Sequence, residues 1–388
     1  MKRDNDFKNK TFPEHSRFGS FVAKWLLAPF NILELIGSYL FARPMLFLLS
    51  KFDDWSYKIE GTFFKTMLVH GLFPLTLIVT LILGFNAVEE GVTLGSLTSL
   101  TITLVMYGLI FAPLERLLPF SRDWFDVGNS YTVDLMMLYS GIFWSAISKF
   151  LLSLLFIIGI VNWLEPYGRA IWPSMLPDWV EVFLFLLIKD FFRYWYHRWM
   201  HEIPFMWRWH AVHHSSKSLY WLNGIRSHPL EIIVQTIIWA IPLALLQPPQ
   251  EIVVVSVFMA LSIGTFQHAN LELKLGFWEY IFSIGDNHRY HHYNKAGIGD
   301  SNYGGEYIVW DILFGTFHKP KGERPSKDIG IAAFPNYPQT MSGLMVAPFV
   351  PDQEVFGFGL QQDDQTLKKE YDDGLSNRQP LTEHKDGK

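Results

Sequence analysis

The sequence predicts an all-α integral membrane protein with about four transmembrane helices, a further helical hairpin and a histidine-rich helical cap. Three observations lead to this fold class. Of the 388 residues, 49% are hydrophobic and only 18% are charged, which is far from the composition of a soluble domain. The apolar residues gather in long blocks. Ten of the 14 histidines lie between His197 and His292.

Four apolar blocks each approach the ~20 residues that a helix needs to cross a hydrocarbon core. They cover residues 66–85, 97–113, 130–161 and 179–196. A buried core helix of a large soluble protein is the alternative for any single block, but four such blocks with a matching charge pattern favour membrane spans. Residues 20–50 are apolar but interrupted by Lys, Arg and Pro, which predicts helices that lie in the membrane interface.

Two further apolar runs, residues 229–246 and 251–266, are joined by the stretch QPPQ. Because proline cannot continue a helix, this pattern predicts a helical hairpin that enters the membrane and returns. His228 and His268 lie at its two feet, on the same side as the other histidines. Both are therefore candidate metal ligands.

Lys and Arg are distributed unevenly among the predicted loops. The first 65 residues contain ten of them, and the loop after the first apolar block contains none. Since cytoplasmic loops are rich in Lys and Arg, we expect the N-terminus, the histidine motifs and the C-terminal tail of this multi-pass protein to be cytoplasmic. The predicted organisation is a cytosolic or interfacial segment, transmembrane helices, a catalytic domain and a polar, disordered cytosolic tail, covering residues 1–65, 66–178, 179–320 and 321–388.

Three histidine motifs occur in order along the second half of the chain. The motif HRWMH contains His197 and His201, HAVHH contains His210, His213 and His214, and HRYHH contains His288, His291 and His292. Each spacing puts the imidazoles of a motif on one helical face. Neighbouring histidines on a helix point about 100° apart, so each triplet can reach two metal ions. Eight imidazoles exceed what one ion accepts, which predicts a two-metal site.

Asp190 lies seven residues before His197 on the same helical stripe. At ~1.5 Å per residue it is about 10 Å away along the helix axis, which is too far to share a metal ion with His197. It can still accept a ring N–H from a histidine of another helix and so fix the tautomer of that ligand. The alternative is a membrane-edge pair with Lys189 or Arg193.

The donor set indicates the chemistry. An all-imidazole shell suits iron and leaves it open to a small ligand such as O2, and two irons can use O2 to attack an unactivated C–H bond of a lipid. The chain has no cysteine, which excludes disulfides, iron–sulfur clusters and Cys-ligated zinc. A zinc-dependent membrane hydrolase is a competing interpretation, but HRWMH lacks the glutamate of HExxH enzymes. A metal transporter would place its ligands nearer the bilayer midplane.

The sequence between about residues 180 and 318 resembles the fatty acid hydroxylase superfamily of membrane diiron enzymes. The resemblance rests on DFFRYWYHRWMHE, WRWHAVHHSS, RSHPLE, FQHANL, DNHRYHHYN and NYGGEYIVWDILFGTF. It implies two iron ions held by the eight motif histidines, with His268 as an additional ligand and zinc as a substitute in purified protein. It also implies O2 as co-substrate, a membrane lipid as substrate and an external electron donor such as a ferredoxin, cytochrome, reductase or pterin. No nucleic-acid partner is expected.

The same resemblance implies hydroxylation of a lipid C–H bond in a fatty acyl chain, sterol, sphingolipid or ether lipid. Desaturation is the close alternative, because both reactions begin with hydrogen abstraction. Glu202, directly after the first histidine motif, joins Asp190 as a candidate catalytic residue. The alternative for Glu202 is a helix-end carboxylate that pairs with Arg198 or Arg208.

Overall fold

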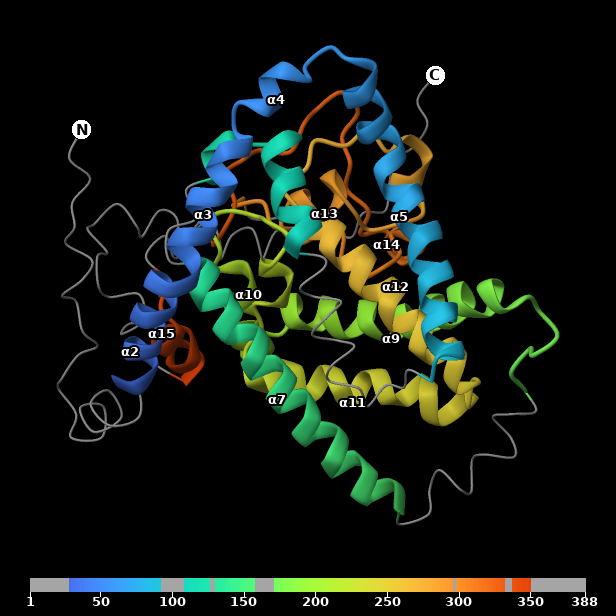
Figure 1. The fold of residues 1–388 in the computed structure, drawn as a ribbon. Helices are drawn as coiled ribbons and strands as arrows, with labels where there is room; N and C mark the ends of the chain where they lie inside the picture. The colour runs from blue at the N-terminus through green and yellow to red at the C-terminus, as the bar shows by residue number, and fades with distance from the viewer. Residues whose placement is uncertain are drawn as a thin grey trace, which may run out of the picture.

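The computed structural model describes six stretches of the chain, and its helices are arranged as Figure 1 shows. These stretches are residues 28–91, 108–125, 130–157, 171–295, 298–331 and 337–349. Within them the regular structure is helical, and the only β-type pairings are three isolated bridges, such as the one between Pro119 and Leu271. The predicted all-α class is confirmed.

Five helical segments in the described residues are long and apolar enough to cross a membrane. They are α5 (Phe63–Glu89), α7 (Ser130–Ile157, apolar over 130–153), α11 (Pro229–Leu246), α12 (Gln250–His268) and the continuous run Pro29–Lys58. That run joins α2 (Ala28–Gly37), the π-helix η3 (Ser38–Ala42), α3 (Arg43–Leu49), η4 (Ser50–Phe52) and α4 (Trp55–Lys58). The membrane-protein class predicted from composition therefore agrees with the helices that form.

Two predictions about the apolar segments differ from the structure. The block at residues 179–196, predicted as a span, forms the first part of α9 (Asp178–Glu202), which is not among the five segments, because Lys189, Asp190 and Arg193 interrupt its apolar sequence. The segment predicted to lie in the interface contributes instead to the apolar run Pro29–Lys58. Most of the block at 97–113 lies outside the described residues, which include only its helical end from residue 108.

The two arms of the predicted hairpin are present, but they diverge. α11 ends where Gln247 takes a left-handed conformation (φ 46°), and α12 begins after Pro249. α11 packs against α7 and α9, whereas α12 packs against α5 and α9, so α9 lies between the two arms (Figure 1). The proline-containing turn was predictable from the sequence, whereas the position of α9 between its two arms depends on tertiary packing.

α12 is the innermost of the apolar helices. In its most apolar stretch 61% of the residues are buried inside the protein, against 11% for α7. Its Val255 and Ile263 belong to the same core as Phe73 of α5 and Leu186 of α9, and all four side chains are fully buried. This core fixes the end of α12, where His268 lies, relative to α9.

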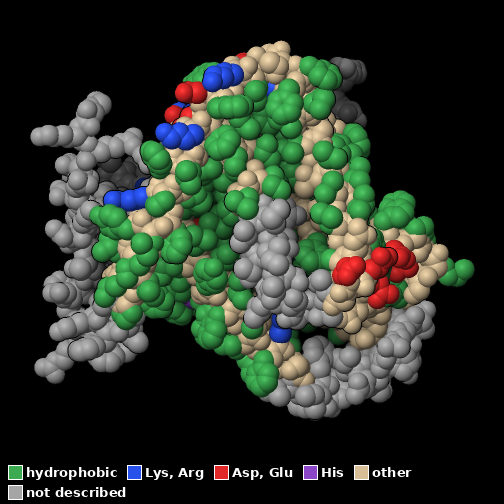
Figure 2. Space-filling model, in the orientation of Figure 1, with side chains coloured by type: hydrophobic (Ala, Val, Ile, Leu, Met, Phe, Trp, Pro, Cys, Tyr) green, Lys and Arg blue, Asp and Glu red, His purple; other side chains and the backbone are tan. Residues whose placement is uncertain are grey.

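The outer faces of the apolar helices are exposed. Leu75, Ile82 and Leu83 of α5 and Phe41 and Leu48 of the N-terminal run are all more than half exposed. Figure 2 shows that hydrophobic side chains cover the face over α2, α3 and α5, while charged side chains of both signs lie around α4 and Asp and Glu gather near the far end of α5. A contiguous apolar surface of this extent is typical of contact with lipid.

The predicted polar tail begins later than expected. Residues 337–349 form α15 (Met341–Val346) and the short η8 (Ala347–Phe349), and Met341 and Leu344 are buried. α15 packs against α2 and α7, and η8 packs against α10 (Pro204–His214). The boundary predicted at residue 320 therefore falls inside packed structure; residues 350–388 lie outside the described ranges.

Candidate metal centre

Nine of the ten candidate histidines converge in two adjacent groups. Within each group, the ligand nitrogens all lie within 4.8 Å of one another, and every member is buried. The five-histidine group is His197, His201, His210, His214 and His291. The four-histidine group is His213, His268, His288 and His292. The rings of His214 and His292 stack across the boundary, with centroids 4.4 Å apart.

Helical geometry explains how four segments supply two groups. α9 provides His197 and His201 one turn apart, α10 ends in the HAVHH triplet, and α12 ends in His268. The short helix α13 (Asp286–His291) carries the second triplet, with His292 as its C-terminal cap. Each adjacent pair, 213–214 and 291–292, is divided between the two groups, as expected for neighbours that point about 100° apart.

Within the groups the Nε2 atoms face one another at close range. Five pairs lie 3.0–3.3 Å apart: His197–His210, His210–His214, His213–His268, His268–His288 and His288–His292. The Nε2 atom of His291 is also buried, and it has no hydrogen-bond partner among the described residues. The space between these nitrogens is therefore surrounded by imidazole donors.

The opposite ring nitrogens are oriented by oxygen atoms. His197 Nδ1 lies 2.7 Å from the carbonyl oxygen of Tyr303, and His291 Nδ1 lies 2.8 Å from that of Ser301. Because a carbonyl oxygen can only accept, Nδ1 carries the proton in each ring and donates it. A neutral ring has one N–H, so Nε2 then presents a lone pair to the centre of the group.

Two further rings of the five-histidine group meet carboxylates. His210 Nδ1 lies 3.1 Å from Glu231 in the first turn of α11, and His201 Nδ1 lies 3.3 Å from Asp300. A carboxylate that accepts a ring N–H fixes the tautomer and makes the other nitrogen a stronger ligand.

Burial keeps these imidazoles neutral. It lowers the pKa of His210 to about 3 and lowers the pKa of His214, His291 and His292 well below the usual range. Neutral lone pairs about 3 Å apart repel one another unless a cation lies between them. The donor set therefore fits two borderline transition-metal ions, one for each group.

Asp190 contacts a loop rather than a histidine. Its carboxylate accepts the backbone N–H groups of Gly305 (2.9 Å), Glu306 (3.0 Å) and Tyr307 (2.9 Å). Gly305 has to be glycine, since a Cβ there would lie 2.4 Å from Asp190 Oδ1. The predicted direct bond from Asp190 to a ring N–H is absent among its contacts in the described residues. Asp190 instead holds the loop whose Tyr303 carbonyl orients His197.

Asp311 holds the other half of this loop. Its two carboxylate oxygens accept the N–H groups of Tyr303 and Gly304, each at 2.7 Å, and Thr316 donates to it as well. Burial raises the pKa of Asp311 to about 6. The alternative for Asp190, an ion pair with Lys189 or Arg193, is absent among the described contacts, because both cations pair with Glu306 of the loop instead.

Two candidates lie outside both groups. His228 caps α11, where its Nδ1 accepts the N–H of Leu230, and its Nε2 lies 3.2 Å from the carbonyl oxygen of Met345. Glu202 forms an ion pair with Arg198 at 2.8 Å on the partly exposed surface of α9, which is the alternative that the sequence left open. The divergence of α11 from α12 explains why only one foot of the hairpin reaches the histidines.

Sequence reasoning missed the groups that orient the ligands. Glu231 carried a detectable signal, because it is an acidic residue within RSHPLE, at the start of an otherwise apolar helix. Asp300 lies in the loop that follows HRYHH, and its sequence context carried no such signal. The carbonyl oxygens of Tyr303, Ser301 and Arg226 have no sequence signature, since every residue has a carbonyl group.

Fold and site together define a multi-helix membrane protein with a buried centre lined by two groups of histidines that could each hold a metal ion. A family model described as fatty acid hydroxylase matches residues 182–316. The ornithine lipid hydroxylase OlsE of Rhizobium tropici is 32% identical over 229 residues, which are 57% of this chain and 67% of that protein. The chain belongs to the fatty acid hydroxylase family.

Other relatives match a shorter part of the sequence. Human alkylglycerol monooxygenase is 36% identical over 139 residues, covering 36% of this chain and 30% of that protein. Methylsterol monooxygenase 2-2 of Arabidopsis thaliana is 28% identical over 165 residues, covering 40% of this chain and 59% of that protein. The matched part thus spans about a third of the alkylglycerol enzyme. No solved structure gives a significant match.

Proposed function

We propose that the chain is an O2-dependent diiron oxidoreductase that hydroxylates a C–H bond of a membrane lipid. The observation that supports it most is the convergence of nine buried, neutral imidazoles into two adjacent groups at the end of an apolar helix. The relatives named as hydroxylases and monooxygenases support the reaction class. Their names also support lipid as the substrate class.

The nine histidines are the proposed ligands, with one iron ion in each group. Bound iron supplies the activation of O2 and the oxidation of the C–H bond. Tyr303, Ser301 and Arg226 hold ring N–H groups through their carbonyl oxygens. Glu231 and Asp300 lie beside Nδ1 of His210 and His201 and so fix the tautomers of these two rings.

The reaction balances only with an external reductant. One oxygen atom of O2 enters the C–H bond and the other leaves as water, which consumes two electrons and two protons. The donor belongs to the class of ferredoxins, cytochromes, reductases or pterins. The protein side chains bind and orient the metal ions and keep the centre buried.

The position of the centre favours a lipid substrate. His268 is the last residue of α12, a helix that packs against α5 in the apolar part of the protein. The loop after it returns to the start of α5, where Lys274 N donates to Val69 O and Lys274 O lies 2.9 Å from His70 Nδ1. The four-histidine group is thus at the end of the apolar helices, which supports a lipid as the substrate class.

The product of the reaction tests the proposal. Wild-type protein and the His213→Ala variant are expressed in one bacterial host under isotopically labelled O2, and the lipids are compared by mass spectrometry. We expect lipids with one labelled hydroxyl oxygen in the wild-type strain alone. Lipids that have lost two hydrogens without gaining label would identify a desaturase. Identical lipids in both strains would contradict an oxidative function.

The charge distribution supports a cytoplasmic centre. Lys51 and Lys58 lie at the α4 end of the apolar helices, whereas Glu89 is the last residue of α5 and Glu90 is its C-terminal cap. Reporter fusions after residue 90 should therefore report the side opposite to fusions after residue 215. A common location for both would refute this topology.

A further inference from the structure

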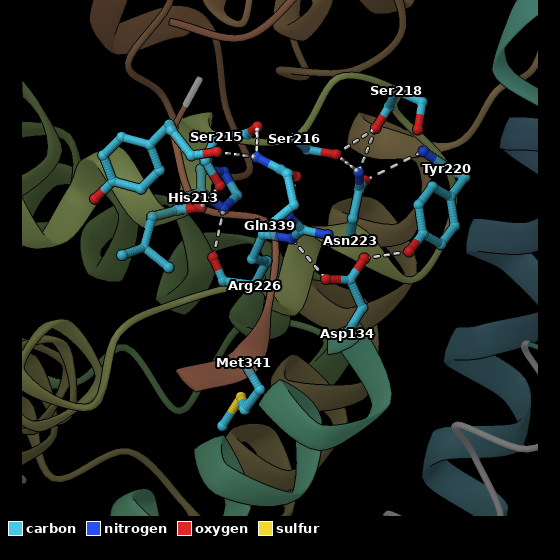
Figure 3. Close-up of polar contacts among 12 residues, drawn as sticks. Asp134, His213, Ser215, Ser216, Ser218, Tyr220, Asn223, Arg226, Gln339 and Met341 are labelled. Carbon is cyan, nitrogen blue, oxygen red and sulfur yellow. Dashed lines mark hydrogen bonds and ion pairs between the residues drawn. The ribbon is translucent and has the colours of Figure 1, made fainter. Parts of the chain in front are cut away.

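A fully buried ion pair joins the membrane helix α7 to the loop beside the four-histidine group. Arg226 Nε lies 2.6 Å from Asp134 Oδ1, and both side chains are completely buried. The hydroxyl of Tyr220 donates to the other oxygen of Asp134. A further N–H of Arg226 donates to the side-chain oxygen of Gln339 at 3.2 Å, as Figure 3 shows. The Arg226 side chain is therefore held from two sides.

The backbone of the same residue orients a proposed ligand. The carbonyl oxygen of Arg226 lies 3.2 Å from His213 Nδ1, so it accepts the ring N–H and leaves Nε2 for the four-histidine group. Two residues earlier, a Cβ at Gly224 would lie 2.7 Å from His268 Nδ1. The segment 224–226 thus touches two members of that group.

The chain between His214 and Arg226 is tied to the same network. Gln339 donates its amide N–H to the carbonyl oxygen of Ser215 at 2.9 Å. Asn223 donates to Ser216 Oγ at 2.8 Å, and its side-chain oxygen accepts the N–H of Tyr220. These bonds leave the segment after α10 little freedom to move independently of Arg226 (Figure 3).

The five-histidine group is oriented by other residues. His197, His291 and His210 find their Nδ1 partners in Tyr303, Ser301 and Glu231. Among the described contacts, none of these three partners bonds to Asp134 or Arg226. The two groups therefore have separate supports, although they lie side by side.

We infer that the Asp134–Arg226 ion pair positions His213 and so sets the metal affinity of the four-histidine group independently of the five-histidine group. The inference rests on the proposed two-metal function. When a buried guanidinium loses its counter-charge, its buried position becomes strongly unfavourable. In Asp134→Asn, Arg226 should therefore shift, and its carbonyl oxygen should move away from His213. Loss of such a contact to a ligand typically weakens metal binding by about 10- to 100-fold.

Stepwise cobalt binding tests this selectivity. Co²⁺ is titrated anaerobically into the metal-free full-length protein in detergent, and binding is followed by visible absorption together with metal analysis. We expect two ions per chain for the wild type. In Asp134→Asn the first binding step should be unchanged and the second should weaken by about 10- to 100-fold.

Asp53→Asn is the matched control. It removes the carboxylate that pairs with Arg116 at 3.0 Å, away from the histidine groups, and both binding steps should match the wild type. Tyr220→Phe removes only the hydroxyl that supports Asp134, so it should weaken the second step in the same direction even if Asp134→Asn fails to fold.

The outcomes separate the inference from the function on which it rests. Two ions in the wild type with an unchanged second step in Asp134→Asn and Tyr220→Phe would overturn the inference alone. Equal weakening of both steps would also overturn it, because the pair would then be a general support. Binding of fewer than two ions by the wild type would contradict the proposed two-metal function, and with it the inference.

Discussion

Replacing Asp190 by asparagine tests how the loop that carries Tyr303 is held. The carboxylate accepts three consecutive backbone N–H groups, two at Oδ1 and one, from Tyr307, at Oδ2. Asparagine keeps one oxygen for Gly305 and Glu306 but presents an amide NH2 to the N–H of Tyr307. The hydrogen bond from Tyr307 is lost, and two donors then face each other in a fully buried site.

The magnitude follows from these contacts. A hydrogen bond contributes about 0.5–1.5 kcal/mol net, and a buried donor left without a partner costs about 1–3 kcal/mol. We therefore expect Asp190→Asn to lower the free energy of unfolding by about 2–4 kcal/mol. Because the loop also carries the carbonyl that orients His197, metal affinity of the five-histidine group should fall by about 10- to 100-fold.

Thermal unfolding and metal content of detergent-solubilised protein measure the two effects. Glu202→Gln is the control on the same helix, since its partly exposed pair with Arg198 is worth at most about 1 kcal/mol. Wild-type stability and metal content in Asp190→Asn would show that Asp190 does not clamp the loop as an anion. Complete loss of one metal ion would show that Asp190 is itself a ligand.

Three further predictions concern the histidines. His213→Ala and His291→Ala should abolish turnover while the protein still inserts into the membrane, as membrane fractionation beside the lipid assay would show; wild-type turnover in either variant would remove that residue from the ligand set. His228→Ala should keep both metal ions by elemental analysis and cost about 1 kcal/mol through the lost helix cap, whereas loss of a metal ion would make His228 a ligand. The metal-free protein should become less stable as the pH falls from about 7.5 to about 5. Burial lowers the pKa of His210 to about 3, against about 6.5 in the unfolded chain, so the unfolded state binds more protons over this range. An unfolding temperature that rises on acidification would contradict the buried, neutral state.

Local periodicity explains why much of the centre was predictable. The spacings in HRWMH, HAVHH and HRYHH determine which faces of α9, α10 and α13 carry imidazoles. The division of neighbouring histidines between two groups follows from the ~100° helical step. The all-α class was likewise predicted from the length of the apolar blocks.

The remaining features depend on contacts between distant segments. His228 and His268 were both candidates at the feet of one hairpin, but α9 separates the two arms and only His268 reaches the centre. Asp190 was correctly placed on the stripe of His197, yet its partners are backbone groups 115 to 117 residues away in sequence. No local pattern identifies a partner of that kind.

The metal content of the protein tests the central claim most directly. The chain is purified anaerobically from iron-replete cells, and iron and zinc are quantified per chain by elemental analysis. Two buried histidine groups predict two iron ions per chain. A single zinc ion under these conditions, with no iron, would contradict the diiron account.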